Sequence, residues 1–473
     1  MRRALLLLFC CLAALPWSAQ ARLGGLAENL PHAAATRDLA EIRKSGELRV
    51  LVNQSRNSSG EIKGQAIGLE YHRLHAFEQY LNDQGRDGGS LRLKLIPRAK
   101  EQLLTALQRG EGDLVAPGEL IDAHAGQLVS ASAAIRSDVP IVVVGARGNR
   151  HYLRLDDMSG KVLTLPRGSA AAEALGEVNQ RLAARKQAPI EVQWADPSLA
   201  VEDVLEMVHA GVYPWTAVEQ PIAERWTRVL PRLRIERHLV LGREADMSWY
   251  VRRDAPMLRA SIDRFLAGYR SPADQDAVFQ RVYRRIYKVR DPLARADRQR
   301  LARVAGVLRK HAQQQKLDWL YLAAVAFKES TLNPAARGAG GATGLMQITP
   351  AAARSVGVSN IQVLDNNVRA ASLYLARIRR QFFASSQLEE HQRMAFVLAA
   401  YNLGPQRVQG LRAEARRRGL NPNQWFFQVE RVAMEQLGMG VVSYVNSVNK
   451  YYLAYEQERE GLEPQASRVS AQK

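Results

Sequence analysis

The pattern of apolar residues changes once along the chain, and this change limits the folds that the chain can adopt. From Asp38 to about residue 270, short apolar strands alternate with helical segments, as in an α/β sheet. From about residue 298 to residue 458, only the helical spacing recurs. The chain of 473 residues is long enough for two or three domains. We therefore expect a multidomain protein, with an α/β part followed by a mainly helical part.

The first residues have the composition of a secretory signal peptide. The apolar run Ala4–Leu15 follows two arginines, and Ala19–Ala21 offers small residues for cleavage. Both cysteines of the chain, Cys10 and Cys11, lie inside this segment. We expect a signal peptide over residues 1–21, and a mature chain with no disulfide and no cysteine-based metal site.

Residues 38–270 contain the elements of an α/β domain in a regular order. The predicted strands and helices are a strand at Gly46–Val52, a helix at Gly68–Leu81, a strand at Leu91–Leu95, a helix at Leu103–Gly110 and a strand at Asp113–Ala116. Strands that alternate with helices predict a parallel sheet.

This segment resembles the extracellular solute-binding proteins of the amino-acid-binding type. The likeness rests on Gly46–Val50, Gly68–Tyr71 and Leu103–Ala116. It implies two α/β lobes with a ligand cleft between them, the second lobe spanning about residues 143–238. The family usually offers an arginine that clamps an α-carboxylate, but residues 118–124, where it would lie, contain none.

The ligand of this first domain stays open from the sequence. The resemblance places the acidic residue that holds an α-ammonium group near Glu219. A helix that opens at Gly168 and Ser169 could bind an anion such as a peptide carboxylate at its N-terminus. A small-ligand site and a cleft that serves only packing or regulation are both open.

One carboxylate in the helical part is placed for acid–base chemistry. Helical spacing predicts a helix over Asp318–Glu329 with one apolar face, and with Asp318 as its N-cap. Glu329 lies three residues after Ala326 and so points inward. The helix C-terminus and burial both raise the pKa of such a carboxyl group. A carboxylic acid that stays protonated near neutral pH can protonate the leaving oxygen of a glycosidic bond. The alternative is a solvated glutamate in a frayed last turn.

A glycine-rich segment separates this helix from the next. It contains four glycines, namely Gly338, Gly340, Gly341 and Gly344. Gln347 follows, and then Thr349 and Pro350, which are expected as the N-cap and the first residue of a new helix.

These residues resemble the motif set of the soluble-lytic-transglycosylase family, which has a goose-type lysozyme-like fold. The motifs are Glu329-Ser330, Asn333-Pro334, Gly344–Gln347 and Ala400–Asn402. The resemblance implies that residues 298–458 cut peptidoglycan between N-acetylmuramic acid and N-acetylglucosamine without water, leaving a 1,6-anhydro ring. It also implies that Glu329 serves as the single general acid and base.

The same resemblance implies the substrate contacts. The residues are Ser330, Gly344, Met346, Gln347, Tyr401, Asn402 and Tyr444. For Met346 and Tyr444 the alternative is core packing, and for Ser330 it is a helix cap. Most glycosidases use two carboxylates, but no second acid stands at a spacing that puts it beside Glu329. Asp365, the nearest downstream acid, is expected as a helix N-cap.

The order of the two domains resembles the membrane-bound lytic murein transglycosylase F type. That likeness implies a periplasmic enzyme, peripheral to the outer membrane, whose first domain regulates the second by binding muropeptides or cell-wall peptides. The net charge of +19 favours anionic partners such as cell-wall glycan, and no nucleic-acid signature is present. We expect no cofactor and no metal. Residues 271–297 are predicted as a part-helical linker, and residues 459–473 as a disordered tail.

Two other functions are compatible with the sequence. The first is a non-catalytic periplasmic sensor or scaffold whose lysozyme-like domain only holds glycan. The second is a plain hydrolase, which would need a placed water molecule and usually a second acid.

Overall fold

The computed structural model describes residues 37–463, apart from 56–60, 63, 64, 67, 86–89 and 122–128. The predicted signal peptide and the last ten residues of the predicted tail therefore lie outside the described residues. Among the helices of the described part, none has the length and apolar character needed to cross a membrane.

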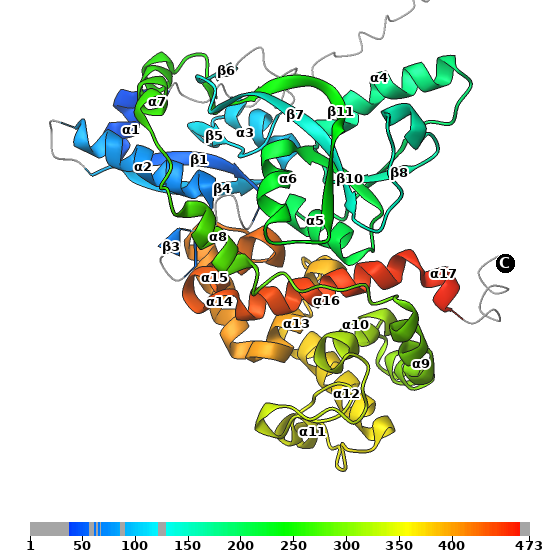
Figure 1. Ribbon diagram of the computed structural model, residues 1–473. Helices are drawn as coiled ribbons and strands as arrows, with labels where there is room; N and C mark the ends of the chain where they lie inside the picture. Colours follow the sequence, from blue (N-terminus) through cyan, green and yellow to red (C-terminus); the bar gives the residue numbers. More distant parts are fainter. Residues whose placement is uncertain are drawn as a thin grey trace, which may run out of the picture. The chain divides into compact units, whose positions relative to one another are not determined.

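The first lobe is built on a five-stranded sheet with the order β4-β1-β5-β12-β6 (Figure 1). Its strands are β1 (Glu47–Asn53), β4 (Arg92–Arg98), β5 (Leu114–Ala116), β6 (Val129–Ala131) and β12 (Tyr250–Arg252). β1 is parallel to β4 and β5, as predicted, but β12 is antiparallel to β5 and β6. The parallel pairing predicted for the strands up to Ala116 is thus confirmed, whereas β12 enters from the second lobe and not through a crossover helix.

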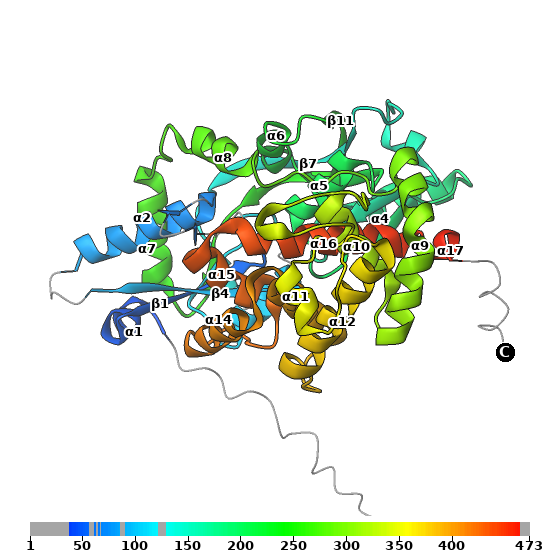
Figure 2. The same ribbon diagram turned by 90° about the horizontal axis from the view of Figure 1, so that it is seen from below.

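Helices cover the sheet of the first lobe. They are α1 (Leu39–Ser45), α2 (Leu69–Asp83), α3 (Leu103–Gln108) and α7 (Pro256–Gly268), and a short hairpin, β2 (Glu61–Ile62) with β3 (Gln65–Ala66), precedes α2. α2 and α7 lie side by side (Figure 2) and bring Phe77 and Phe265 against Trp249. These side chains form one apolar core with the buried residues of β1.

The second lobe is mainly antiparallel. Its main sheet has the order β10-β7-β11, from β7 (Arg136–Ala146), β10 (Trp215–Glu219) and β11 (Leu233–Met247), and a parallel pair joins β8 (Val162–Leu165) to β9 (Glu191–Trp194). The helices are α4 (Ala171–Ala184), α5 (Val201–Ala210) and α6 (Gln220–Thr227). β7 lies next to β11 along most of its length (Figure 1), so the two longest strands link this lobe to the first.

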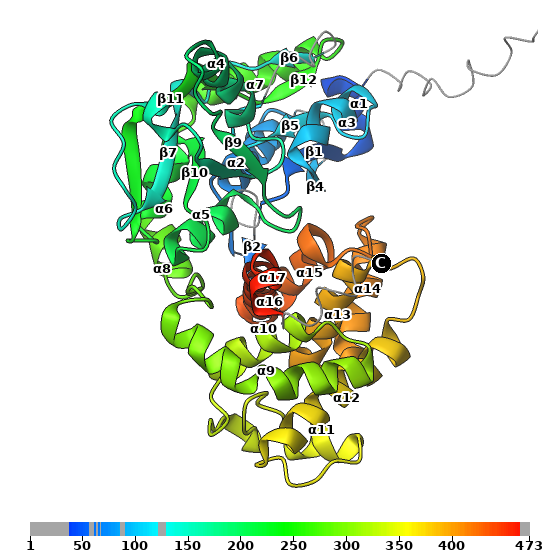
Figure 3. The ribbon, with the colours of Figure 1, turned by 90° about the vertical axis from the view of Figure 1, so that its right-hand side faces the viewer.

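The C-terminal part is helical, as predicted. Its helices are α9 (Arg295–Gln315), α10 (Trp319–Ser330), α11 (Pro350–Ser355), α12 (Leu364–Phe382), α13 (Glu390–Leu403), α14 (Pro405–Arg417), α15 (Glu430–Leu437), α16 (Met439–Gln457) and α17 (Arg459–Leu462). α10 packs between α9 and α16 (Figure 3), and every side chain from Trp319 to Phe327 is buried. The prediction of a single apolar face is therefore incomplete, because α10 is buried on all sides over these residues.

Several predicted boundaries differ from the structure. The predicted linker contains a helix, as expected, namely α8 (Gln275–Tyr283), but this helix packs Phe279 and Tyr283 against Trp226 of α6. The predicted disordered tail starts with α17, whose Arg459 pairs with Asp318. α14 carries several arginines and has only a few buried residues, Val408, Leu411 and Ala415.

Candidate active site

Glu329 lies in the last turn of α10 and is half-buried. Its Oε1 atom accepts a hydrogen bond from the Tyr444 hydroxyl at 2.7 Å. Burial raises the pKa of Glu329 above its ordinary value, and the Tyr444 hydrogen bond and the Lys328 ammonium offset this only in part. The carboxyl group thus holds its proton to a higher pH than a solvated glutamate does.

Tyr444 reaches Glu329 because α16 packs along α10. The rings of Phe327 and Tyr451 meet edge to face with centroids 4.6 Å apart, and the Lys328 Nζ donates to Ser447 Oγ at 3.2 Å. Tyr444 is buried, and burial followed by the negative charge of Glu329 raises its pKa far above the ordinary value. Its hydroxyl therefore stays a hydrogen-bond donor. The Tyr444 side chain is therefore both packed in the core and hydrogen-bonded to Glu329.

The glycine-rich loop after α10 is fastened to the end of that helix. Ser330 Oγ donates to the Leu345 carbonyl at 2.8 Å, and it also accepts from the Asn333 amide at 3.1 Å. Tyr401 donates its hydroxyl to the Met346 carbonyl at 2.9 Å. The side chains of Ser330 and Tyr401 therefore hold the loop next to Glu329.

Gly344 occupies a position that excludes a side chain. Its φ is +76°, and a Cβ atom there would lie 2.4 Å from Asn367 Nδ2. The buried Asn367 accepts from the Met346 amide at 2.9 Å and donates to the carbonyls of Thr343 and Ile361 at 2.8 and 3.0 Å. Asn367 thus determines the course of the loop, a role that sequence reasoning missed because nothing in a helical segment marks it.

Three of the predicted substrate contacts have distinct surroundings. Met346 is fully buried, so its side chain belongs to the core, and its backbone forms part of the loop. Gln347 has φ of +46° and donates through Nε2 to the carbonyls of Ala336 and Gly344. Asn402 is exposed near the end of α13, one residue after Tyr401.

No carboxylate acts on the pKa of Glu329 among the described residues, where the causes are burial, Tyr444 and Lys328. Asp365 is not the N-cap of α12, contrary to prediction. Val363 takes that place, and Asp365 instead pairs from the first turn with Lys310 at 2.7 Å and His311 at 3.0 Å, which hold its pKa below the ordinary value. The two predicted caps of the neighbouring helices, Asp318 and Thr349, are confirmed.

A basic cavity of about 430 Å³ begins where α10 ends. Residues 330–334 line this cavity together with Arg290, Arg300 and Arg303. Asp297 pairs with Arg300 at 2.6 Å and lies 3.9 Å from Arg290, so it offsets part of their charge. Arg290 also lies over the ring of Phe327, 5.0 Å from its centroid. A cavity of this charge suits a ligand that carries carboxylates.

In the first domain, the chain itself engages the acid that was predicted to hold an α-ammonium. Glu219 is buried, accepts from the Leu120 amide at 2.8 Å and lies 3.7 Å from Lys100 Nζ. Glu119 pairs with the same ammonium at 2.8 Å. Burial opposes the charge on Lys100, but the two carboxylates outweigh it and raise its pKa. Lys100 thus occupies the place where a ligand ammonium would meet Glu219.

The predicted anion site is also partly filled. α4 begins at Ala171, two residues later than Ser169, and Ser169 Oγ accepts from the Ala171 amide at 3.3 Å. A Cβ atom on Gly168 would meet the Glu101 carboxylate at 3.1 Å. An acidic neighbour at this distance disfavours an anion. A cleft of about 470 Å³ lies elsewhere, lined by residues of both lobes and of α8, among them Arg73, Arg225 and Asp276.

Known proteins similar to this chain fall into two groups. Residues 306–424 match the family model described as the transglycosylase SLT domain. The membrane-bound lytic murein transglycosylase F of Desulfosudis oleivorans is 28% identical over 415 residues, which cover 85% of this chain and 85% of that protein. The protein of the same name from Stutzerimonas stutzeri is 28% identical over 400 residues, which cover 82% of this chain and 77% of that protein.

Among solved structures, the amino acid ABC transporter substrate-binding protein AbpA from Streptococcus pneumoniae, bound to L-arginine, aligns with 53% of this chain and 100% of its own. The sequence identity is 15% and the TM-score is 0.40. The helical part of the present chain carries a transglycosylase SLT domain, and the chain is similar over most of its length to proteins named membrane-bound lytic murein transglycosylase F.

Proposed function

We propose that this protein is a peptidoglycan lytic transglycosylase that cleaves the β-1,4 bond between N-acetylmuramic acid and N-acetylglucosamine and leaves 1,6-anhydro ends. The observation that carries the proposal is the half-buried Glu329 carboxyl group, with its raised pKa and its hydrogen bond from Tyr444. The SLT domain and the names of the relatives support the same reaction class.

One carboxyl group is enough for this reaction. The protonated Glu329 donates its proton to the glycosidic oxygen as the bond from that oxygen to C1 of the muramic acid breaks. The C6 hydroxyl of the same sugar then bonds to C1, and its proton passes to the Glu329 carboxylate, which returns to its starting form. Between the two steps the carboxylate is ionised, and the Tyr444 hydroxyl stabilises it by the hydrogen bond to Oε1.

The partner and the location follow from charge and likeness. The arginines beside residues 330–334 and the net charge of +19 suit glycan strands that carry lactyl and peptide carboxylates. The signal peptide predicted from the sequence directs the protein to the periplasm. The relatives are named membrane-bound, and we propose peripheral association of this protein with the outer membrane.

We further propose that the first domain regulates cleavage by binding muropeptides or cell-wall peptides. Support comes from α16, which carries both Tyr444 and Lys450, and Lys450 pairs with two acids of α5 in the second lobe. Lys450 Nζ lies 2.6 Å from Asp203 and 2.5 Å from Glu206, and all three groups are buried. A shift of α5 would therefore act on the helix that positions the Glu329 partner.

The reaction is tested by mass spectrometry of purified peptidoglycan after digestion by the wild type, by Glu329→Gln and by Glu389→Gln, an exposed acid of the same domain. Anhydro-muropeptides from the wild type and Glu389→Gln, but not from Glu329→Gln, are expected. The hydrolytic product would be heavier by one water molecule and would refute the transglycosylase reaction. Glycan binding without any product would favour the sensor or scaffold instead.

Regulation is tested on the full chain. Muropeptides are titrated into the protein by calorimetry, and hydrogen exchange of α16 is followed in parallel. We expect a heat of binding together with a changed exchange rate at residues 439–457. Absence of binding across a broad muropeptide panel would overturn the regulatory proposal and leave the cleavage reaction untouched.

A further inference from the structure

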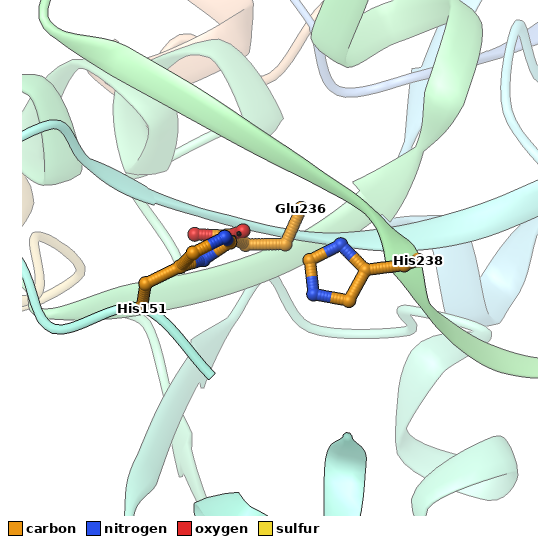
Figure 4. Close-up of side chains that lie close together, drawn as sticks. All are labelled: His151, Glu236 and His238. Atoms are coloured by element: carbon orange, nitrogen blue, oxygen red, sulfur yellow. Dashed lines mark ion pairs between the residues drawn. The ribbon is translucent and has the colours of Figure 1, made fainter. Parts of the chain in front are cut away.

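Three side chains with metal-binding groups gather on the second lobe, away from the cleavage site. The ligand atoms of His151, Glu236 and His238 all lie within 4.8 Å of one another (Figure 4). Figure 4 shows the His151 ring and the Glu236 carboxylate one over the other, with the His238 ring beside them. We propose that these three residues bind a divalent transition-metal ion, and that Zn²⁺ is the ion they suit best. This departs from the expectation that the protein holds no metal.

The backbone brings the three residues together by a local irregularity. Glu236 and His238 both lie on β11, and the pairing of β11 with β7 shifts between Glu236 and Val240. Such a bulge changes the direction of the side chains next to it, and bulges of this kind are frequent beside functional sites. His151 comes from the segment that follows β7, so the cluster joins that segment to β11.

Outer hydrogen bonds prepare the ligands. His238 Nε2 lies 2.7 Å from the Tyr152 carbonyl, which can only accept, so Nε2 carries the proton and Nδ1 keeps its lone pair. A histidine ligand of a metal ion is usually oriented in this way. Glu236 Oε1 is engaged by Arg234 at 2.5 Å, whereas Oε2 faces His151 Nδ1 at 2.9 Å.

Arg234 orients the carboxylate and does not close the site. Its guanidinium group also donates to the backbone carbonyls of Arg147, Asn149 and Arg150 at 3.1 Å each, so it ties Glu236 to the segment that carries His151. Its positive charge weakens the attraction for a cation. The Glu236 oxygen that faces His151 nevertheless stays available for a metal ion.

The geometry needs a small closure to hold an ion. Tetrahedral zinc binds nitrogen and oxygen at about 2.0–2.2 Å, so its ligand atoms stand roughly 3.3 Å apart. The present limit of 4.8 Å requires inward movements of roughly 1 Å, which the exposed rings of His151 and His238 can make by rotation. Two imidazoles and one carboxylate favour zinc, copper or nickel over magnesium or calcium. Three protein ligands leave a fourth position for water.

The test uses the full chain without an affinity tag that binds metal, after treatment with a chelator. Zn²⁺ is titrated by calorimetry, and Co²⁺ is titrated in parallel because its visible absorption reports the coordination geometry. The variants are His151→Ala and His238→Ala. His75→Ala is the matched control, since His75 is also exposed and pairs with a carboxylate, Glu78, at 2.7 Å.

We expect one equivalent of Zn²⁺ to bind the wild type and the His75→Ala variant with the same affinity. Loss of either ligand histidine should weaken binding by about tenfold or more, since even loss of outer partners has effects of that size. The melting temperature of the wild type should rise with Zn²⁺, and that of the two ligand variants should not. Absence of stoichiometric binding, or equal binding by His151→Ala, would overturn the proposal. Murein cleavage by the wild type does not bear on this outcome.

Discussion

Replacing Gly344 by alanine tests how the loop beside Glu329 is held. Two costs arise from the structure. A non-glycine residue at φ of +76° costs about 1–2 kcal/mol. The new Cβ atom would also lie 2.4 Å from Asn367 Nδ2, so the asparagine must move away. The buried Met346 amide then loses its acceptor, at about 1–3 kcal/mol. We expect a total destabilisation of about 2–5 kcal/mol.

Gly340 offers a matched control in the same segment. Its φ is +63°, but a Cβ atom there would meet nothing within 4 Å. Gly340→Ala should therefore show the backbone cost alone, about 1–2 kcal/mol. The difference between the two variants isolates the contact with Asn367, about 1–3 kcal/mol.

Thermal denaturation and hydrogen exchange measure these effects. For a domain of this size, the difference corresponds to a melting temperature about 2–12 °C lower for Gly344→Ala than for Gly340→Ala. The Met346 amide should exchange faster only in Gly344→Ala. Cleavage should fall in the same variant, because Ser330 and Tyr401 both bind carbonyls of this loop. Equal losses of stability in the two variants would refute the reasoning.

Three further predictions concern charged and hydrogen-bonded groups. Tyr444→Phe removes a hydrogen-bond donor to Glu329, so the pKa of Glu329 should rise further. The alkaline limb of the pH–activity profile should then move to higher pH. An unchanged profile would contradict the role of this hydrogen bond. The folded chain binds the Glu329 proton more tightly than the unfolded chain, so stability should fall as the pH rises above the ordinary pKa of 4.5. Glu329→Gln should therefore melt at a higher temperature than the wild type near neutral pH, but not below pH 4.5. A difference in melting temperature that stays constant with pH would refute this. Lys450→Ala leaves Asp203 and Glu206 buried without their cation, so the free energy of unfolding should fall by about 3–5 kcal/mol, as measured by thermal denaturation. The control Lys94→Ala removes an exposed pair with Glu47 and should lower it by less than about 1 kcal/mol.

Local rules account for much of the helical part. The predicted caps Asp318 and Thr349 are caps in the structure, and Pro350 opens α11. Such caps depend on side chains that bind amides two or three residues away, so a single stretch of sequence contains all the information. Helical spacing also predicted that Glu329 lies at the end of a helix, which the structure confirms.

Other features depend on contacts between distant segments. The antiparallel β12 and the buried circumference of α10 follow from which elements pack together, and a periodic pattern does not give that. The acids Glu219 and Asp365 were assigned by position, yet their partners Lys100 and Lys310 come from elsewhere in the chain. A part-helical linker was predicted, but the packing of α8 against α6 was not, because it joins two separate segments.

By itself, the sequence determined the helix that carries Glu329, the caps around it and the change from an α/β to a helical pattern. Only the tertiary structure brought Tyr444 to Glu329, Asn367 to the loop at Gly344, and His151 to Glu236 and His238. The physical reason is the range of each interaction. Capping and helical spacing act within a few residues, whereas burial and the hydrogen bonds that set the acidity of Glu329 require helices far apart in the chain to pack.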